Sequence, residues 1–267
     1  MTKTELNRAL KSAKDAALAV GVLLRRNLDS DKQVNDSTTH DIKLELDVRC
    51  QNLIERRLRK AFPEITLLGE EGEQLMTHGE YRWVVDPIDG TVNFCHGIPH
   101  ACVCIALQKR SRSKAAKLDH GYRTILGLVY DPFMDELWTA IDGGPALLNG
   151  KRIRVTRTAR LIDSMVAMGF GKNEKTLRRS LKLFNVLSVK AQKVRNMGSA
   201  GLAIVYVASG RFDAYIEQGI SLWDVAAGGF ILERAGGEYW RQPGETPLTY
   251  KMIASNGRLK TTLKRLH

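Results

Sequence analysis

The sequence predicts an α/β fold in which layers of helices and sheets alternate. Apolar residues recur every three or four positions over the first 28 residues, which indicates an amphipathic helix. Between residues 65 and 141 the pattern changes to short β-like runs separated by turn residues. After residue 164, strand-like and helix-like runs alternate. An α+β half followed by an α/β half is typical of stacked layers.

The elements of the first half follow in order. The first helix is expected to reach about Leu28, and a polar segment, Asp29–Thr39, comes next. A second helix is expected over Asp47–Phe62, because the residue after it is a proline. A hairpin should close this half, because Asn149-Gly150 is typical of a two-residue turn. Five strands are expected between the second helix and this hairpin, at ITLLG, RWVVD, ACVCIALQ, TILGLVYD and ELWTAI.

The second half is expected to alternate between strands and helices. The predicted elements are a strand at SMVAMGF, a helix over Glu174–Val189, a helix SAGLAIVYVASG ending at Gly210, a strand FDAYIE, a helix WDVAAGGFILERAG, a strand MIASN and a basic helix. The polar, basic segment Lys109–Arg123 is expected to be an exposed loop. We expect two halves, 1–155 and 156–267, that form one compact catalytic unit.

Positive charge is the main feature of the composition. The formal net charge is +12, and much of the excess lies in Arg56–Lys60, Lys109–Lys117 and Arg258–Arg265. Such an excess attracts anionic substrates, anionic membrane surfaces or nucleic acid. Solvated helix faces and a loop explain each run taken alone. A nucleic-acid partner therefore stays an alternative.

The four cysteines are expected to pack in the interior rather than to form disulfides or bind metal. Cys102 and Cys104 form a C-x-C pair in an apolar run, which places both thiols on one face of a strand. Cysteine usage of this kind favours the cytoplasm. The sequence has no apolar run of the length that a membrane-spanning helix needs. Its N-terminus lacks the pattern of a signal peptide.

Acidic residues occur at the ends of three strand-like or turn segments. Glu70 follows ITLLG, Asp86 and Asp89 follow the run RWVV, and Asp224 opens a helix. Each alone is common at a surface, in a turn or at a helix start. Four carboxylates gathered at one sheet edge would repel one another unless a divalent cation neutralised them. All-oxygen ligands suit Mg²⁺ or Mn²⁺ rather than Zn²⁺.

The residues between and after the two aspartates fit the same site. The main-chain oxygen of Ile88 offers one more ligand. Gly90 lets the backbone approach a ligand closely. Thr91 is expected to begin a helical turn whose free N–H groups suit an anion.

These strings resemble the inositol monophosphatase family. WVVDPIDGTVNF is similar to its first signature, SLWDVAAGGFILERAGG to its second and LLGEEG to its glutamate motif. DIKLELD, GLVYDPFMDELWTA and GSAGLAIVYVASGRFDAYIE extend the resemblance, which runs from about Asp41 to Gly237. It implies a five-layer αβαβα sandwich of the inositol monophosphatase/fructose-1,6-bisphosphatase type, usually a homodimer. It also implies lithium-sensitive, magnesium-dependent hydrolysis of phosphate monoesters.

The resemblance also implies a role for each site residue. The expected metal ligands for two or three Mg²⁺ ions, with Mn²⁺ as a substitute, are Glu70, Asp86, Asp89, Asp224 and the main-chain oxygen of Ile88. One ion activates a water that Glu70 and Thr91 position, and another neutralises the departing ester oxygen. Asp47 is expected to hydrogen-bond Thr91. The expected substrate-binding residues are Gly90, Thr91, Gly198, Ser199, Ala200, Glu217 and Asp224.

The substrate predicted from the resemblance is a small phosphorylated polyol, with inositol monophosphate first. A carboxylate at Glu217 faces polyol hydroxyls better than a second phosphate. The segment Leu46–Val48 is similar to the fructose-bisphosphatase branch, which makes that activity the alternative. Histidinol phosphate, nucleoside bisphosphates and NADP are substrates of other relatives. Some bacterial relatives bind transcription or ribosome-assembly machinery, so an RNA-binding role is the alternative of another class.

Two positions depart from the family pattern. Leu44, preceded by Lys43, stands where the family usually has Thr. Lys43 either replaces a weakly bound third cation, contacts the substrate phosphate or points into solvent, and lithium sensitivity depends on which. Val92 stands where Thr is common, which removes a hydroxyl beside the phosphate turn.

Overall fold

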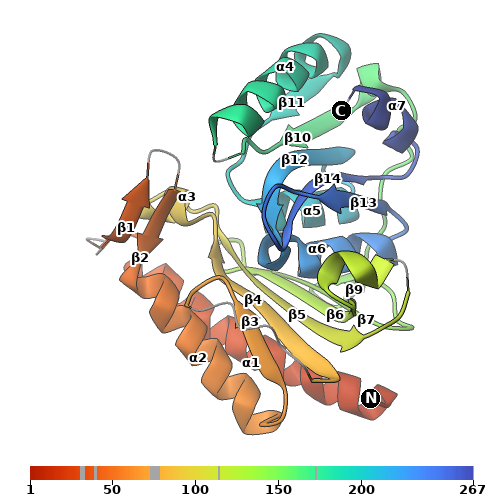
Figure 1. The fold of residues 1–267 in the computed structure, drawn as a ribbon. Coiled ribbons are helices and arrows are strands. Elements are labelled where there is room, and N and C mark those ends of the chain that lie inside the picture. The colour runs from red at the N-terminus through yellow and green to blue at the C-terminus, as the bar shows by residue number, and fades with distance from the viewer. Residues whose placement is uncertain (31–33, 39–40, 73–78, 114, 172, 267) are drawn as a thin grey trace.

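Five layers of helices and sheets make up the fold, as Figure 1 shows. The structure is a computed structural model that describes residues 1–30, 34–38, 41–72, 79–113, 115–171 and 173–266. Side chains are described for the same residues except 34–38, 41–43 and 115. The order of layers is helix, sheet, helix, sheet, helix, which confirms the predicted αβαβα sandwich.

The first layer consists of α1 (Lys3–Asn27) and α2 (Glu45–Ala61), which pack on one face of the larger sheet. α1 begins with a capping box, because the Glu5 N–H donates to Thr2 Oγ1 at 3.3 Å and the Glu5 carboxylate accepts from the Thr2 N–H. Its buried face runs from Leu6 to Leu24, as the apolar period predicts.

The larger sheet has seven strands in chain order. They are β3 (Thr66–Gly69), β4 (Tyr81–Asp89), β5 (Cys102–Arg110), β6 (Tyr122–Asp131), β7 (Glu136–Ile141), β8 (Leu147–Leu148) and β9 (Lys151–Arg152). β3 and β4 are parallel and every other pair is antiparallel. Asn149 and Gly150 both have positive φ between β8 and β9, which confirms the predicted hairpin.

Two helices lie between the sheets, and a second sheet follows. The central helices are α5 (Ala200–Ala208) and α6 (Leu222–Arg234), and both are buried on nearly every side. The second sheet has the order β11-β10-β12-β14-β13, with bounds Lys193–Arg195, Met165–Met168, Ala214–Ser221, Thr249–Ser255 and Glu238–Pro243. β10 is parallel to β11 and β12, whereas β14 is antiparallel to β12 and β13.

The outer layer consists of α4 (Glu174–Lys190) and α7 (Lys260–Leu266). Three apolar clusters hold the five layers together. One lies between α1, α2 and the larger sheet, one surrounds α5 and α6, and one lies beneath α4 and α7. Among the described residues, no helix is both long enough and apolar enough to cross a lipid bilayer.

Several short elements were not predicted. β1 (Val34–Thr38) and β2 (Asp41–Leu44) form a separate antiparallel pair. β1 lies within the predicted polar segment Asp29–Thr39, of which 31–33 and 39 lie outside the described residues. β11 and β13 were also missed. The remaining elements are α3 (Thr91–Cys95), the predicted turn after Gly90, and two 3₁₀ helices, η1 (Ala115–Asp119) and η2 (Leu161–Asp163).

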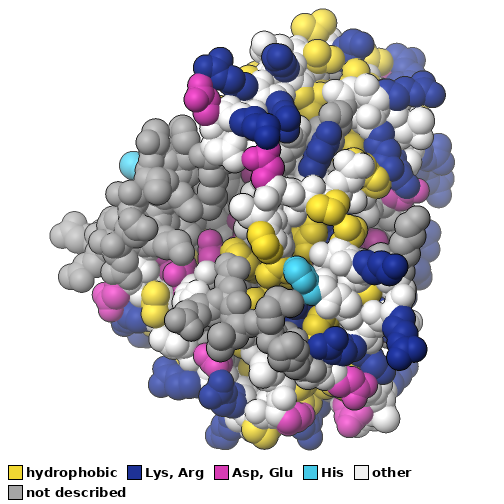
Figure 2. All heavy atoms as spheres, viewed as in Figure 1, with side chains coloured by type: hydrophobic (Ala, Val, Ile, Leu, Met, Phe, Trp, Pro, Cys, Tyr) yellow, Lys and Arg dark blue, Asp and Glu magenta, His cyan; other side chains and the backbone are white. Residues whose placement is uncertain are grey.

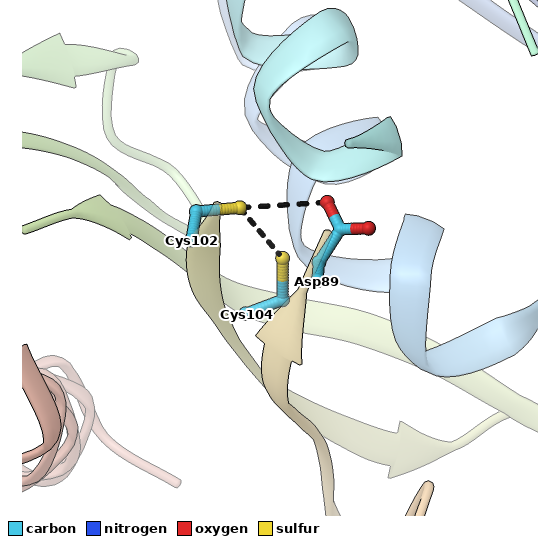
Figure 3. Close-up of side chains that lie close together, drawn as sticks. All are labelled: Asp89, Cys102 and Cys104. Atoms are coloured by element: carbon cyan, nitrogen blue, oxygen red, sulfur yellow. Dashed lines mark hydrogen bonds between the residues drawn. The ribbon is translucent and has the colours of Figure 1, made fainter. Parts of the chain in front are cut away.

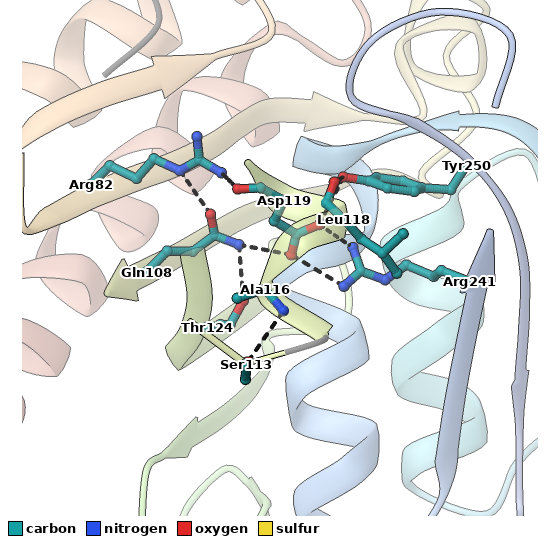
Figure 4. Close-up of polar contacts among 9 residues, drawn as sticks. All are labelled: Arg82, Gln108, Ser113, Ala116, Leu118, Asp119, Thr124, Arg241 and Tyr250. Atoms are coloured by element: carbon teal, nitrogen blue, oxygen red, sulfur yellow. Dashed lines mark hydrogen bonds and ion pairs between the residues drawn. The ribbon is translucent and has the colours of Figure 1, made fainter. Parts of the chain in front are cut away.

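The prediction that Lys109–Arg123 is an exposed loop was wrong. β5 continues to Arg110, β6 begins at Tyr122, and the η1 turn places Asp119 in the interior. Figure 4 shows why: Asp119 forms a buried ion pair with Arg241 of β13, at 2.6 Å between Nη1 and Oδ1. The Tyr250 hydroxyl donates to the same carboxylate at 2.7 Å. An arginine and a tyrosine of the other sheet therefore anchor the basic segment through its one aspartate.

Candidate active site

Two aspartates lie at the carboxyl end of β4, where the strand becomes irregular. The register with β5 shifts between Asp86 and Asp89, across a proline that has no N–H to donate. The Ile88 N–H donates instead to Asp86 Oδ1 at 3.0 Å. Gly90 follows with φ of 99°, a left-handed conformation that favours glycine. α3 then begins at Thr91, whose hydroxyl donates to the Ile88 carbonyl at 2.8 Å.

Glu70 reaches the same edge from the neighbouring strand. β3 and β4 are parallel with Gly69 opposite Val85, and the Glu70 N–H donates to the Val85 carbonyl at 3.2 Å. Glu70 therefore follows the end of β3 next to the position where Asp86 ends the regular part of β4.

A glutamine from α2 holds the turn that carries Glu70. Gln51 Oε1 accepts from the Glu71 N–H at 3.0 Å, and its Nε2 donates to the Glu71 carbonyl at 2.7 Å. A Cβ at position 69 would lie 2.1 Å from Gln51 Oε1, so only glycine leaves space for this side chain. Sequence reasoning gave Gln51 no role, because a glutamine in a polar helix has no distinguishing signal.

Asp224 comes from the start of α6. Its Oδ2 accepts from the Ser221 N–H at 2.9 Å, so Asp224 is not the N-cap but the third residue of a capping box whose N-cap is Ser221. The Asp224 carboxylate also lies close to the side chains of Glu70 and Asp86. Oxygens of Glu70, Asp86 and Asp224 all lie within 4.8 Å of one another.

The electrostatics of this cluster favour a cation. Burial raises the pKa of the Asp86 carboxyl well above its usual range, and the neighbouring carboxylates of Glu70, Asp89 and Asp224 raise it further. Three converging carboxylates are hard oxygen donors of the kind that hold Mg²⁺ or Mn²⁺. The donor set of the described residues therefore fits a hard divalent cation.

The fourth predicted ligand, Asp89, faces α5 rather than the other three carboxylates. Its Oδ2 accepts from the Ser199 hydroxyl and the Gly201 N–H, both at 2.6 Å. Its Oδ1 accepts from the Ala200 N–H at 3.2 Å. These donors have no partner within the helix, so an anion binds them well. Asp89 is nevertheless close enough to raise the pKa of Asp86. Its role as a ligand stays a prediction.

Cys102 and Cys104 lie next to Asp89 (Figure 3). Their sulfurs are 3.7 Å apart on one face of β5, as the C-x-C spacing predicts, and both are fully buried. Burial raises the pKa of the Cys102 thiol well above its usual range.

A cavity of about 280 Å³ opens over the carboxylates. The predicted substrate residues Gly90, Thr91, Gly198, Ser199, Ala200 and Glu217 all line it. Asn93 joins the two sides, because its Nδ2 donates to the carbonyls of His100 at 2.9 Å and Met197 at 2.8 Å. Sequence reasoning had assigned no contact to Asn93.

Glu217 lies in the wall of the same cavity. The Tyr215 hydroxyl donates a hydrogen bond to Glu217 Oε2. A Cβ at Gly169 would lie 2.2 Å from that oxygen, so the neighbouring strand leaves room for the carboxylate. Glu217 is therefore held by the protein and is not an exposed strand-end residue. Tyr215 had not been predicted.

Asp47 lies in the first turn of α2, after Leu44. Asp47 is buried, and its Oδ2 accepts from the Leu44 N–H at 2.7 Å, which caps α2. Its hydrogen bond to Thr91 stays a prediction. Leu44 is 1% exposed in the apolar core and does not line the cavity. The side chain of Lys43 lies outside the described residues, so its three interpretations stand.

A profile of the inositol monophosphatase family matches residues 5–267. The chain belongs to this family. It is 34% identical to a protein of Xylella fastidiosa named Nus factor SuhB, over 100% of this chain and 95% of the relative. It is 38% identical to an inositol-1-monophosphatase of Rhizobium meliloti, over 77% of this chain and 74% of the relative. The solved extragenic suppressor protein suhB from Bartonella henselae superimposes with a TM-score of 0.85 at 31% identity, covering 96% of this chain and 97% of the other.

Membership of the inositol monophosphatase family confirms the resemblance seen in the two signatures. The family is one of phosphatases, hydrolases of phosphoric monoesters, and it is normally metal-dependent. Relatives named Nus factor SuhB and inositol-1-monophosphatase have similar sequence identity to this chain, 34% and 38%. The name of a relative therefore does not decide the substrate.

Proposed function

We infer that this chain hydrolyses phosphate monoesters of small polyols with Mg²⁺ as cofactor, and that inositol monophosphate is its preferred substrate. The observation that carries this proposal is the cluster of Glu70, Asp86 and Asp224, whose oxygens lie within 4.8 Å. The cluster lines a cavity that Glu217 also lines. A cation-binding end and a hydroxyl-accepting end suit a phosphorylated polyol.

The cation ligands would be these three carboxylates, the Ile88 carbonyl and Asp89. Bound Mg²⁺, or Mn²⁺ in its place, would polarise the phosphoryl oxygens, lower the pKa of water and neutralise the leaving oxygen. Two or three ions are expected by resemblance to the family. The same resemblance keeps a homodimer as our expectation.

The protein itself would bind the phosphate and handle the proton. Gly90 and Thr91 line the cavity at the start of α3, and we expect their N–H groups to donate to phosphate oxygens. Thr91 Oγ1 is held by the Ile88 carbonyl, which orients the hydroxyl beside the carboxylates. We propose that Glu70 accepts the proton of the attacking water, with Thr91 positioning that water and Asp47 supporting Thr91.

Glu217 is expected to select the substrate. Its carboxylate accepts hydrogen bonds from hydroxyls and repels a second phosphate, so inositol monophosphate should be hydrolysed faster than fructose 1,6-bisphosphate. Glu217→Gln should lower kcat/KM for inositol monophosphate by about ten- to one-hundredfold, because hydrogen bonds to charged groups contribute about 1.5–3 kcal/mol. The ratio between the two substrates should shift toward the bisphosphate.

The measurement is phosphate release from a panel of esters with Mg²⁺, including histidinol phosphate, a nucleoside bisphosphate and NADP. Glu245→Gln is the matched control, because Glu245 is an exposed partner of Lys175. A parent enzyme that prefers fructose 1,6-bisphosphate, or a Glu217→Gln variant with the parent's ratio, would contradict the assignment.

RNA binding is the second candidate function. It is favoured by relatives named Nus factor SuhB and by the net charge of +12. Figure 2 shows Lys and Arg side chains over much of the visible face, including the region of α4. Arg179 and Lys182 of α4 line a second cavity of about 340 Å³ together with Lys251. We propose this cavity as the first place to look for phosphate-backbone contacts.

The salt dependence of RNA affinity tests this candidate. The slope of log K against log salt should be steep, and Arg179→Ala/Lys182→Ala should flatten it by about 0.7 for each phosphate that is no longer neutralised. Lys11→Ala/Lys14→Ala on α1 is the control, with a parent-like slope. Negligible RNA binding by the parent at low salt would remove the candidate.

A further inference from the structure

The thiol pair beside Asp89 has the dimensions of a metal site of a different kind from the carboxylate cluster. Cys102 Sγ lies 3.7 Å from Cys104 Sγ and 3.5 Å from Asp89 Oδ2, as Figure 3 shows. One ligand atom from each of the three residues lies within 4.8 Å of the others. The Ser199 hydroxyl is 3.7 Å from Cys102 Sγ and 2.6 Å from Asp89 Oδ2. Two thiol sulfurs and one carboxylate oxygen therefore lie together in the interior.

These separations match the edges of a tetrahedral thiolate site. With Zn–S near 2.3 Å and Zn–O near 2.1 Å, a tetrahedron has S···S edges of about 3.8 Å and S···O edges of about 3.6 Å. The observed values of 3.7 Å and 3.5 Å differ from these by little.

We propose that Cys102, Cys104 and Asp89 bind one soft divalent cation, Zn²⁺ or its heavier homologue Cd²⁺. Each thiol loses its proton to solvent on binding, so two protons are released for each ion. Two thiolates, one carboxylate and one dication leave a net charge of −1 at the site. The Gly201 and Ala200 N–H groups at the start of the nine-residue helix α5 already donate to Asp89, and they stabilise that charge.

The ligand types sort cations between the two sites. Thiolates select soft ions, whereas the three carboxylates of Glu70, Asp86 and Asp224 select hard ones. Asp89 and Ser199 line the cavity above the carboxylates, so the thiol site borders that cavity through Asp89. A soft ion bound at the thiol site would use Asp89 as a ligand, so Asp89 would no longer be free to bind Mg²⁺. The predicted consequence, which rests on the proposed function, is inhibition of phosphate release by Cd²⁺.

Co²⁺ is the probe for the thiol site, used with the metal-free full chain, because excess Mg²⁺ would compete for Asp89; only the thiol site can give a thiolate band. One equivalent should give a thiolate-to-cobalt charge-transfer band in the near ultraviolet and tetrahedral ligand-field bands in the visible. Two protons should be released for each Co²⁺ in weakly buffered solution. Cys104→Ser should weaken Co²⁺ affinity by more than about 100-fold, since it removes a ligand rather than a supporting contact.

The other two cysteines supply matched controls. Cys50→Ser in α2 and Cys95→Ser in α3 should keep the bands. Circular dichroism checks the fold of each variant, and Cys102→Ala supplies a second change at the site. Absence of the charge-transfer band in the parent, or its persistence in Cys102→Ser/Cys104→Ser, would overturn the proposal. The spectra need no substrate, so an inactive chain that shows the bands would contradict only the proposed hydrolysis.

Discussion

Asp86→Asn is expected to lower phosphate release by at least about three powers of ten, because a metal ligand contributes several kcal/mol to the transition state. The same substitution should stabilise the metal-free protein. It removes a buried charge that faces Glu70, Asp89 and Asp224, while asparagine keeps the oxygen that accepts from the Ile88 N–H. Turnover assays with Mg²⁺ and thermal unfolding in a chelator measure the two effects.

The stability effect of Asp86→Asn should depend on pH. The folded protein binds the Asp86 proton more tightly than the unfolded chain, because the pKa is raised on folding. The stability of the parent therefore falls as pH rises above the unfolded value of about 3.9, and the advantage of the variant should widen toward neutral pH. Asp163→Asn, which alters only an exposed partner of Arg160, is the control. Parent-like turnover in Asp86→Asn would overturn the cation assignment.

Asp119→Ala is expected to destabilise the chain by about 3–5 kcal/mol, the range for breaking a buried ion pair by removing one partner. The side chains of Asp119 and Arg241 are 5% and 12% exposed, so the guanidinium would stay in the interior without its carboxylate. The Tyr250 hydroxyl would lose its shorter hydrogen bond. Urea unfolding of the metal-free protein, with an unchanged m-value, measures the loss.

The exposed pair of Arg123 and Asp142 supplies the comparison. Its atoms are 2.8 Å apart, but its side chains are 43% and 38% exposed, so Asp142→Ala should lower the free energy of unfolding by about 1 kcal/mol or less. Equal losses in the two variants would show that the interior pair does not anchor the basic segment.

Sequence patterns predicted most of the fold, because its main elements carry strong local signals. β4 and β5 contain the apolar runs WVV and CVCIAL, and α1 and α4 have clear helical periods. β13 was missed because EYWRQP is polar, ends in proline and lies at the sheet edge. The polar β1–β2 pair was missed for a related reason, since it belongs to neither of the two main sheets.

The site could be predicted as a set of residues but not as an arrangement. Glu70 and Asp86 end neighbouring strands, which strand-end patterns can anticipate. The partner of Asp89 is a hydroxyl 110 residues later in the chain, and the partner of Asp119 is an arginine 122 residues later. Pairings over such distances are set by the packing of whole layers, and no local pattern encodes them.

Gln51 has a consequence for how the chain could be tuned. Its side chain hydrogen-bonds both the N–H and the carbonyl of Glu71, so α2 is joined directly to the turn that bears Glu70. The outward side of that helix carries the arginines 49, 56 and 59 and faces solvent. A macromolecule bound to those guanidinium groups would contact the helix that holds the Glu70 turn, without entering the cavity.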